Sequence, residues 1–232
     1  MYLDMTYIVL VLPAVLLSLW ASWNVKHTYQ KYSKQINTRG LTGADAARRV
    51  LDANGLRGVP VECVAGELSD HYDPEARAVR LSQGVWSGRS TAAVGVACHE
   101  VGHAIQNAEN YLPVKIRQAI IPATNFGAKL SVPLLMAGLI LCAFVPQFIY
   151  LAYAGVALYA LCAVFQLVTL PTEFDASRRA LRSIDAMGLL DGEEYKGAKK
   201  VLTAAALTYV AALATTLAQL LRFLILVNNR KR

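Results

Sequence analysis

The sequence has little cysteine and little histidine, and long stretches of it carry no charge. Its four cysteines form no Cys-x-x-Cys pair, which argues against a disulfide framework, so we expect free thiols. No internal repeat or low-complexity linker is present. The first apolar stretch has neither a basic region before it nor a small-residue cleavage site after it. We therefore expect a retained N-terminal anchor instead of a cleaved signal peptide.

Charge is missing from four stretches that are each close to the roughly 20 residues a membrane-spanning helix needs. With 55% hydrophobic residues in 232, the chain is too apolar for an ordinary soluble domain. A soluble protein of this size would not need four such helices in its core. The stretches are 5–23, 127–145 (with Lys129 at its edge), 148–170 and 201–221.

The basic residues predict an orientation. Twelve of the 23 lie in 24–126 and six more in 171–200, whereas the Pro146-Gln147 turn has none. The positive-inside rule then places both basic segments in the cytoplasm and the turn outside. Because these residues flank membrane segments and form no single cluster, the charge does not indicate a nucleic-acid partner.

The C-terminal segment, 201–232, does not fit this orientation easily. If it crosses the membrane, Arg230, Lys231 and Arg232 lie outside, against the rule. Two alternatives stay open: the segment spans the bilayer, or it packs against the cytoplasmic domain for part of its length.

Residues 97–104 read Ala-Cys-His-Glu-Val-Gly-His-Ala and contain an HExxH motif. The spacing puts His99 and His103 on one helix face, where both imidazoles can bind one zinc ion. Glu100, rotated about 100° around the helix, faces the open coordination position and is predicted to be the general base. We predict one catalytic zinc ion per chain.

The surroundings of the motif favour a buried helix with one polar face over a chance match. Between 91 and 106 the only charged residue is Glu100. Cys98 falls on the apolar face, so we expect a core residue and not a ligand. Gly95 and Gly102 fall near the histidine face, where they would let another helix approach closely.

An open catalytic zinc site needs a third protein ligand, and two histidines with a glutamate are one known set. Glu173 is the best candidate, because it opens the helix predicted for 173–187 at the level of the membrane surface. Ser177 shares its face and is expected to hydrogen-bond a ligand. Asp175, about 200° away on the helical wheel, is the alternative ligand. Glu173 would also be favourable simply as an acidic residue at the positive end of its helix.

The polar region after the first apolar stretch shows short helix, strand and turn patterns. They predict a helix over 43–54, capped by Thr42 and stopped by Gly55, and then a strand over 60–64. A turn over 70–74 and an edge strand over 77–81, with Ala78 and Arg80 on one face, follow. The HExxH helix, capped by Ser87 or Ser90, comes next, and residues 111–126 are predicted to be an amphipathic approach to the membrane.

Four segments together resemble the YugP-like family of bacterial membrane zinc peptidases, and the resemblance covers essentially the whole chain. They are Asp70-His71-Tyr72-Asp73-Pro74, Val79-Arg80-Leu81-Ser82, residues 94–106, and Pro171-Thr172-Glu173-Phe174-Asp175-Ala176-Ser177.

That family is similar in plan to the HtpX and CAAX prenyl proteases, which are gluzincins with a cytoplasm-facing site. In those proteins a Glu-x-x-Ala-Asp segment carries the third ligand. Here Glu173 and Ala176 match, but Ser177 replaces the aspartate. The resemblance also implies that residues 76–82 form the edge strand above the metal, where a substrate peptide would add as an extra strand.

We therefore expect a polytopic α-helical membrane protein with a small cytoplasmic α+β gluzincin-type zinc peptidase domain, multi-pass in the bacterial cytoplasmic membrane. Its expected parts are an N-terminal transmembrane anchor (1–23), a cytoplasmic α+β domain with the HExxH helix (24–126), a transmembrane hairpin (127–170), a cytoplasmic helix with the third ligand (171–200) and a C-terminal hydrophobic helix (201–232).

The expected reaction is hydrolysis of peptide bonds in a protein or peptide substrate at the cytoplasmic membrane face. Zinc is held by His99, His103 and Glu173, and Glu100 transfers the proton to the leaving amine. The lower-ranked candidates for the oxyanion stabiliser are His71, Tyr72 and Tyr209. The alternative function is a zinc-binding membrane scaffold or chaperone-like partner, although a scaffold has no use for Glu100. A transporter is disfavoured because the apolar stretches contain no charge pair.

Overall fold

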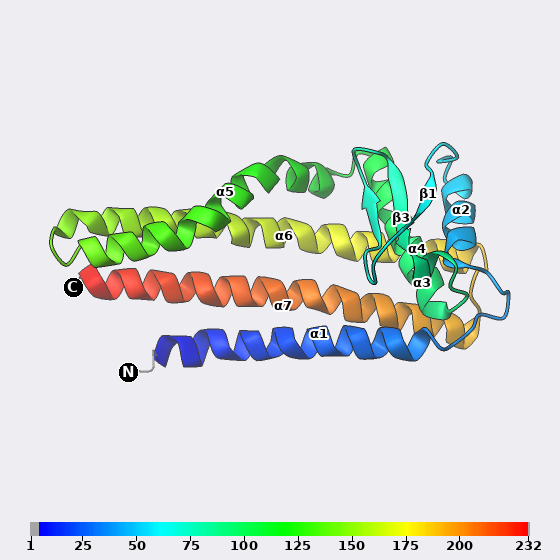
Figure 1. The fold of residues 1–232 in the computed structure, drawn as a ribbon, viewed down its shortest axis with the longest axis horizontal. Helices are drawn as coiled ribbons and strands as arrows, with labels where there is room; N and C mark the ends of the chain where they lie inside the picture. Colours follow the sequence, from blue (N-terminus) through cyan, green and yellow to red (C-terminus); the bar gives the residue numbers. More distant parts are fainter. Residues whose placement is uncertain (1–4, 232) are drawn as a thin grey trace. The chain divides into compact units, whose positions relative to one another are not determined.

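The computed structural model describes residues 5–231 and is mostly helical (Figure 1). The ends of the first and last predicted segments, residues 1–4 and Arg232, lie outside the described residues. Within residues 5–231, four helices are long and apolar enough to cross a membrane, as the four uncharged stretches predict. They are α1 (Leu12–Tyr32, continuing a π-helical turn Tyr7–Val11), α5 (Leu112–Leu141), α6 (Ile149–Ala186, after a 3-10 turn Pro146–Phe148) and α7 (Gly192–Lys231).

The chain divides into two compact units. The first, here called the helical unit, consists of the residues up to Trp20, of Lys115–Leu170 and of the residues from Thr208 onward. The second, here called the α/β unit, consists of Ala21–Val114 and Pro171–Leu207. The helices α1, α5, α6 and α7 each contribute residues to both units.

The length of α7 bears on the two alternatives for the C-terminal segment. Its 40 residues extend about 60 Å at 1.5 Å per residue, twice the roughly 30 Å of a bilayer's hydrocarbon core. Ala198 and Leu202 of α7 lie in the core of the α/β unit, and Phe223 and Val227 lie in the core of the helical unit. One continuous helix is therefore long enough both to pack in the α/β unit and to span a bilayer.

The helical unit is held by helix-to-helix packing. Leu135 of α5 and Val156 of α6 share a core with Phe223 of α7. The Ser18 hydroxyl of α1 lies 2.9 Å from the Thr215 hydroxyl of α7. Hydroxyl pairs of this kind link helices where water is absent.

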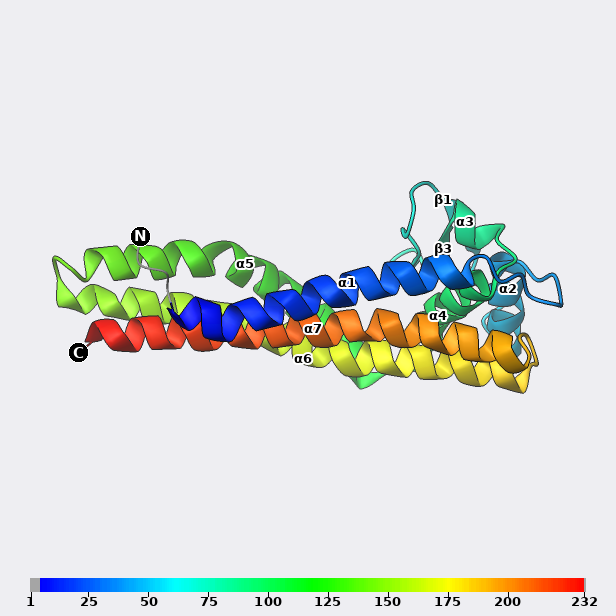
Figure 2. The ribbon, with the colours of Figure 1, turned by 90° about the horizontal axis from the view of Figure 1, so that it is seen from below.

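The α/β unit contains a three-stranded sheet. The strands β1 (Val61–Val64), β2 (His71–Asp73) and β3 (Ala78–Ser82) are arranged in the order β1-β3-β2. Strand β3 runs parallel to β1 and antiparallel to β2. The helices are α2 (Gly43–Ala53), α3 (Gln83–Trp86) and α4 (Thr91–Ala108). Figure 2 shows α2, α3 and α4 close to strands β1 and β3.

Two predictions about the sheet are wrong. Residues 71–73 form strand β2 where we expected only a turn, and β3 is the central strand, not the edge. We expected an edge strand because Arg80 is charged, and a charged residue is unusual in the middle of a sheet. Its guanidinium is paired with Glu62 of β1 on one side and with Asp73 of β2 on the other. Residues 79 and 80 of β3 are paired on both sides, so a substrate peptide cannot add to β3 there.

The helix signals are confirmed where they rest on local chemistry. The Thr42 side chain accepts a hydrogen bond from the Asp45 amide, and the Asp45 side chain accepts one from the Thr42 amide, forming a capping box at the start of α2. The helix ends at Ala53, before Gly55 with a φ of +75°. At the start of α4 it is Ser90, of the two serines considered, whose side chain accepts from the Ala93 amide.

Candidate metal centre

Helix α4 carries the HExxH motif and lies in the core of the α/β unit. Val94, Cys98 and Val101 are fully buried on one face of it, packed with residues of α2 and β3. Burial raises the pKa of the Cys98 thiol to about 12. The thiolate needed to bind a metal is therefore disfavoured, and Cys98 is a core residue as expected.

On another side, α4 packs closely against α6 and α7, because Gly95 and Gly102 have no side chains there. A Cβ on Gly95 would lie 3.3 Å from the Cβ of Ala198 in α7. A Cβ on Gly102 would lie 2.5 Å from the carbonyl oxygen of Ala176 in α6, closer than real side chains permit. The glycines predicted to allow a close approach do so, and the second brings α6 against the histidines.

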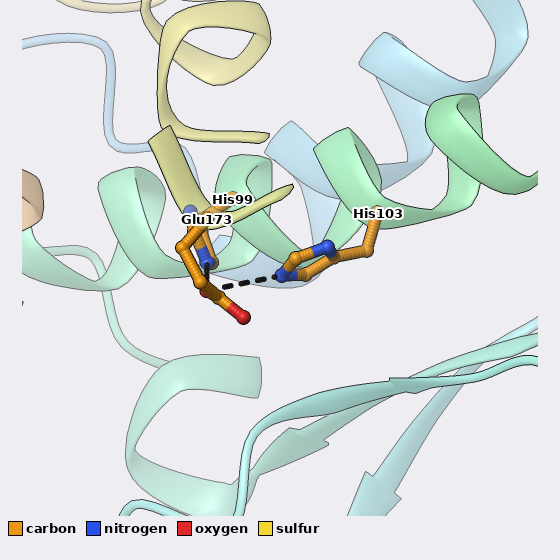
Figure 3. A group of neighbouring side chains, drawn as sticks. All are labelled: His99, His103 and Glu173. Carbon is orange, nitrogen blue, oxygen red and sulfur yellow. Dashed lines mark ion pairs between the residues drawn. The ribbon is translucent and has the colours of Figure 1, made fainter. Parts of the chain in front are cut away.

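Three ligand-type side chains meet at this contact (Figure 3). His99 and His103 extend from α4 toward the Glu173 carboxylate, which comes from α6. Oε2 of Glu173 lies 3.4 Å from Nε2 of His99 and 3.5 Å from Nε2 of His103. Within residues 5–231 this is the one group of three or more histidine, cysteine or acidic side chains close enough to hold a metal ion.

The donor set and its spacing fit zinc. Zinc binds imidazole nitrogen and carboxylate oxygen at about 2.0–2.2 Å in a tetrahedron, which separates neighbouring ligand atoms by about 3.4 Å. Both distances from Glu173 Oε2 agree with this value. The same distances are long for hydrogen bonds, so the three side chains are better placed to share a cation than to bind one another.

Each imidazole is oriented by a second contact on its other nitrogen. The Ser177 hydroxyl lies 3.1 Å from Nδ1 of His99, and the Gln106 side-chain oxygen lies 3.0 Å from Nδ1 of His103. If both Nδ1 atoms donate a proton in these contacts, both Nε2 atoms are left as lone pairs facing Glu173.

Gln106 was not singled out from the sequence, yet it links the two helices of the site. Its side chain is fully buried, and its amide nitrogen donates to the Thr172 carbonyl at 2.8 Å and to the Asp175 carboxylate at 2.9 Å. A signal was present: Gln106 lies three residues after His103, so the two share a helix face.

Asp175, the alternative ligand, has other partners. Its carboxylate accepts hydrogen bonds from Gln106 and, at 2.6 Å, from Arg179 one turn later in α6. Arg179 also pairs with Glu109 at 2.7 Å. Asp175 is therefore outside the three-residue cluster and anchors the glutamine that contacts His103.

The charges around His103 favour a cation. Burial lowers the pKa of its imidazole, but the contact with the Glu173 carboxylate and the nearby Glu100 charge raise it, and the net shift of the pKa is upward. A positive charge on the ring is thus stabilised by two carboxylates, which would also stabilise a divalent ion beside it. Glu100 itself is buried, with 8% of its surface exposed, and its charge acts on His103.

Comparisons with known proteins agree with this geometry. Residues 7–228 match the family described as "Putative neutral zinc metallopeptidase". The chain belongs to this zinc metallopeptidase family. It is also 46% identical over 225 residues to a Bacillus subtilis (strain 168) protein named "Putative membrane protease YugP", a match that covers 97% of this chain and 98% of that protein. No solved structure matches the chain.

The three oxyanion candidates have different surroundings. His71 is exposed, with its Nδ1 2.8 Å from the Ser69 carbonyl. The Tyr72 hydroxyl accepts a hydrogen bond from Asn107, one turn after His103 on α4, at 3.2 Å, and burial raises its pKa. Tyr209 belongs to the part of α7 that lies in the helical unit. Their roles stay predictions.

Proposed function

We propose that the protein is a membrane-embedded zinc metalloendopeptidase that hydrolyses peptide bonds. The observation that carries this proposal is the convergence of His99, His103 and Glu173 at tetrahedral spacing, with Glu100 adjacent on the same helix turn. Membership in a zinc metallopeptidase family supports the same reaction class.

The side chains divide the chemistry among themselves. His99, His103 and Glu173 would hold one zinc ion, which when bound supplies a Lewis acid for carbonyl polarisation and water activation. Glu100 accepts the proton of the attacking water and delivers it to the leaving amine. Ser177 and Gln106 hold the two imidazoles in place, and they act on the ligands and not on the substrate.

Tyr72 is the best supported of the three oxyanion candidates. Its hydroxyl is held against α4 by Asn107, whereas His71 is exposed and bonded to its own loop. The raised pKa of Tyr72 means that its phenol is protonated at neutral pH. The hydroxyl is therefore able to donate a hydrogen bond to an oxyanion.

The proposed location is the bacterial cytoplasmic membrane, crossed several times, with the site facing the cytoplasm. Four candidate spanning helices and the relative named as a membrane protease support the membrane. Eighteen of the 23 basic residues lie in 24–126 and 171–200, which supports the cytoplasmic side for the gluzincin-type domain.

The substitution Glu100→Gln tests hydrolysis directly, because it removes the basic oxygen and leaves the three ligands unchanged. Loss of a general base costs about 10²–10⁴-fold in rate. We expect purified Glu100→Gln protein to retain zinc by elemental analysis and to lose cleavage of unfolded membrane-protein substrates.

Glu75→Gln is a matched control, since Glu75 is an exposed carboxylate in the turn before β3. It should cleave at the wild-type rate. If Glu100→Gln also cleaves at that rate, the mechanism is wrong. If the wild-type protein binds zinc but cleaves no tested peptide or protein, the scaffold alternative is favoured.

A further inference from the structure

A groove with a basic rim lies between the C-terminal part of α1 and the N-terminal part of α7, entirely within the α/β unit. It encloses about 550 Å³. Both helices are candidate membrane spans, and the groove lies at one end of each. The lining residues that matter here are Lys31, Tyr32, Lys196, Lys199, Lys200 and Leu207.

The groove carries positive charge without an acidic lining residue. Four lysines line it, and none of the lining residues is aspartate or glutamate. Lys196 forms a 2.7 Å ion pair with Glu193, a residue that does not line the groove. Lys199 and Lys200 are exposed and make no ion pair within residues 5–231. Two ammonium groups are thus available for an anion.

The rest of the lining is mixed. Tyr32, Ala204 and Leu207 supply apolar surface, and Asn24, His27, Thr28 and Thr203 complete it. Tyr32 lies unusually close to α7, because Gly197 has no side chain there: a Cβ on that glycine would lie 2.7 Å from Cδ1 of the Tyr32 ring. The groove therefore combines a cationic rim with apolar side chains between closely packed helices.

The level of the groove in a membrane follows from Trp23. This side chain is 61% exposed and stacks on His27, with ring centroids 5.2 Å apart. Exposed tryptophan is typical of the membrane–water interface. Lys31 is eight residues further along α1, about 12 Å toward water. The lysine rim therefore lies on the water side of this level, from which the flexible lysine side chains can reach lipid headgroups.

We propose that this groove binds one anionic phospholipid, with its phosphate at Lys199 and Lys200 and the start of an acyl chain against Leu207. Basic pockets between membrane helices recognise lipid headgroups in this way. A soluble phosphate compound would not use the apolar side chains of the lining, and a zwitterionic lipid would not use the unpaired lysine charge. Bound lipid would fix α1 against α7 in the unit that contains the zinc site.

The test is native mass spectrometry of the purified full-length protein titrated with dioleoylphosphatidylglycerol or dioleoylphosphatidylcholine. We expect one phosphatidylglycerol per chain, bound at least about tenfold more tightly than phosphatidylcholine. Lys199→Gln/Lys200→Gln should lower the phosphatidylglycerol affinity by about tenfold. Lys199→Arg/Lys200→Arg, which keeps the charge, should bind like the wild type.

Lys26→Gln/Lys34→Gln is the matched control, because both lysines are exposed near the same end of α1 but do not line the groove. It should leave the affinity within about twofold. An equal loss in this control would show diffuse surface attraction and overturn the proposal. Equal binding of phosphatidylcholine would overturn it as well. Competition by micromolar glycerol 3-phosphate would assign the site to soluble phosphates. Zinc content and cleavage are separate readouts, so this result is independent of the proposed peptidase function.

Discussion

The carbonyl oxygen of Ala176 lies only 2.5 Å from the point where a Cβ would stand on Gly102. Helices α4 and α6 are therefore in backbone contact one residue before His103. Glu173 lies almost one turn before Ala176, so this contact sets how far its carboxylate is from the two imidazoles. The spacing of the candidate zinc ligands therefore depends on the absence of a side chain at Gly102.

Gly102→Ala should force the two helices apart. Overpacking of a buried contact costs about 1–3 kcal/mol, and a shift of a few tenths of an ångström at Glu173 also disturbs the ligand spacing. We expect a lower free energy of unfolding, measured by denaturant titration, and weaker zinc binding, measured by competition with a chelator.

Gly84→Ala is the control, because nothing lies within 4 Å of a Cβ on Gly84. It should change neither quantity appreciably. Zinc affinity and stability of Gly102→Ala equal to those of the wild type would show that the helix contact does not set the ligand geometry.

The ligand set predicts one zinc ion per chain. His99→Ala and His103→Ala should abolish zinc binding, and Glu173→Gln should weaken it, because each removes a ligand atom from the cluster. Asp175→Asn is the matched comparison, since Asp175 is the neighbouring carboxylate outside the cluster. Elemental analysis of detergent-purified protein is the measurement. If Asp175→Asn loses as much zinc as Glu173→Gln, the assignment of the third ligand is wrong.

Ser177 offers a separate test of how His99 is oriented. Ser177→Ala removes the hydroxyl 3.1 Å from Nδ1 of His99. Loss of such an outer contact typically costs about 10–100-fold in metal affinity, and we expect a loss in that range by chelator competition. Ser177→Asp restores an acceptor with more charge and should recover the affinity at least in part. Identical zinc affinities in all three proteins would rule out a role for this contact.

Cys63 makes the orientation testable without an added label, because it is the exposed one of the four cysteines. We expect a membrane-impermeant thiol reagent to spare it in intact cells and to label it after lysis. Gln147→Cys in a Cys63→Ser background should react before lysis, since Gln147 is exposed in the turn between α5 and α6. The reverse pattern would invert the proposed topology.

Features that depend on neighbours along the chain were predictable. Thr42 and Ser90 cap their helices as expected, because a cap needs only the next three residues. The α-helical repeat places His99 and His103 on one face whatever surrounds them. Gly102 also marked the side of approach, although not the partner.

The contacts of Gln106 could not be predicted from its neighbours along the chain. Its position on the His103 face was visible, but its partners Thr172 and Asp175 come from a segment more than sixty residues away. No pattern of neighbouring residues indicates which polar groups on two distant helices will contact each other.

The sequence by itself determined the four apolar helices, the caps of α2 and α4 and the spacing of the two histidines, because all of these follow from composition and from short-range backbone geometry. The tertiary structure decided that β3 is central and that Glu173, not Asp175, joins the histidines. Arg80 could be central only because Glu62 and Asp73 flank it on separate strands. Strand order and the facing of two distant helices are set by long-range packing, and they become definite only when the whole unit has folded.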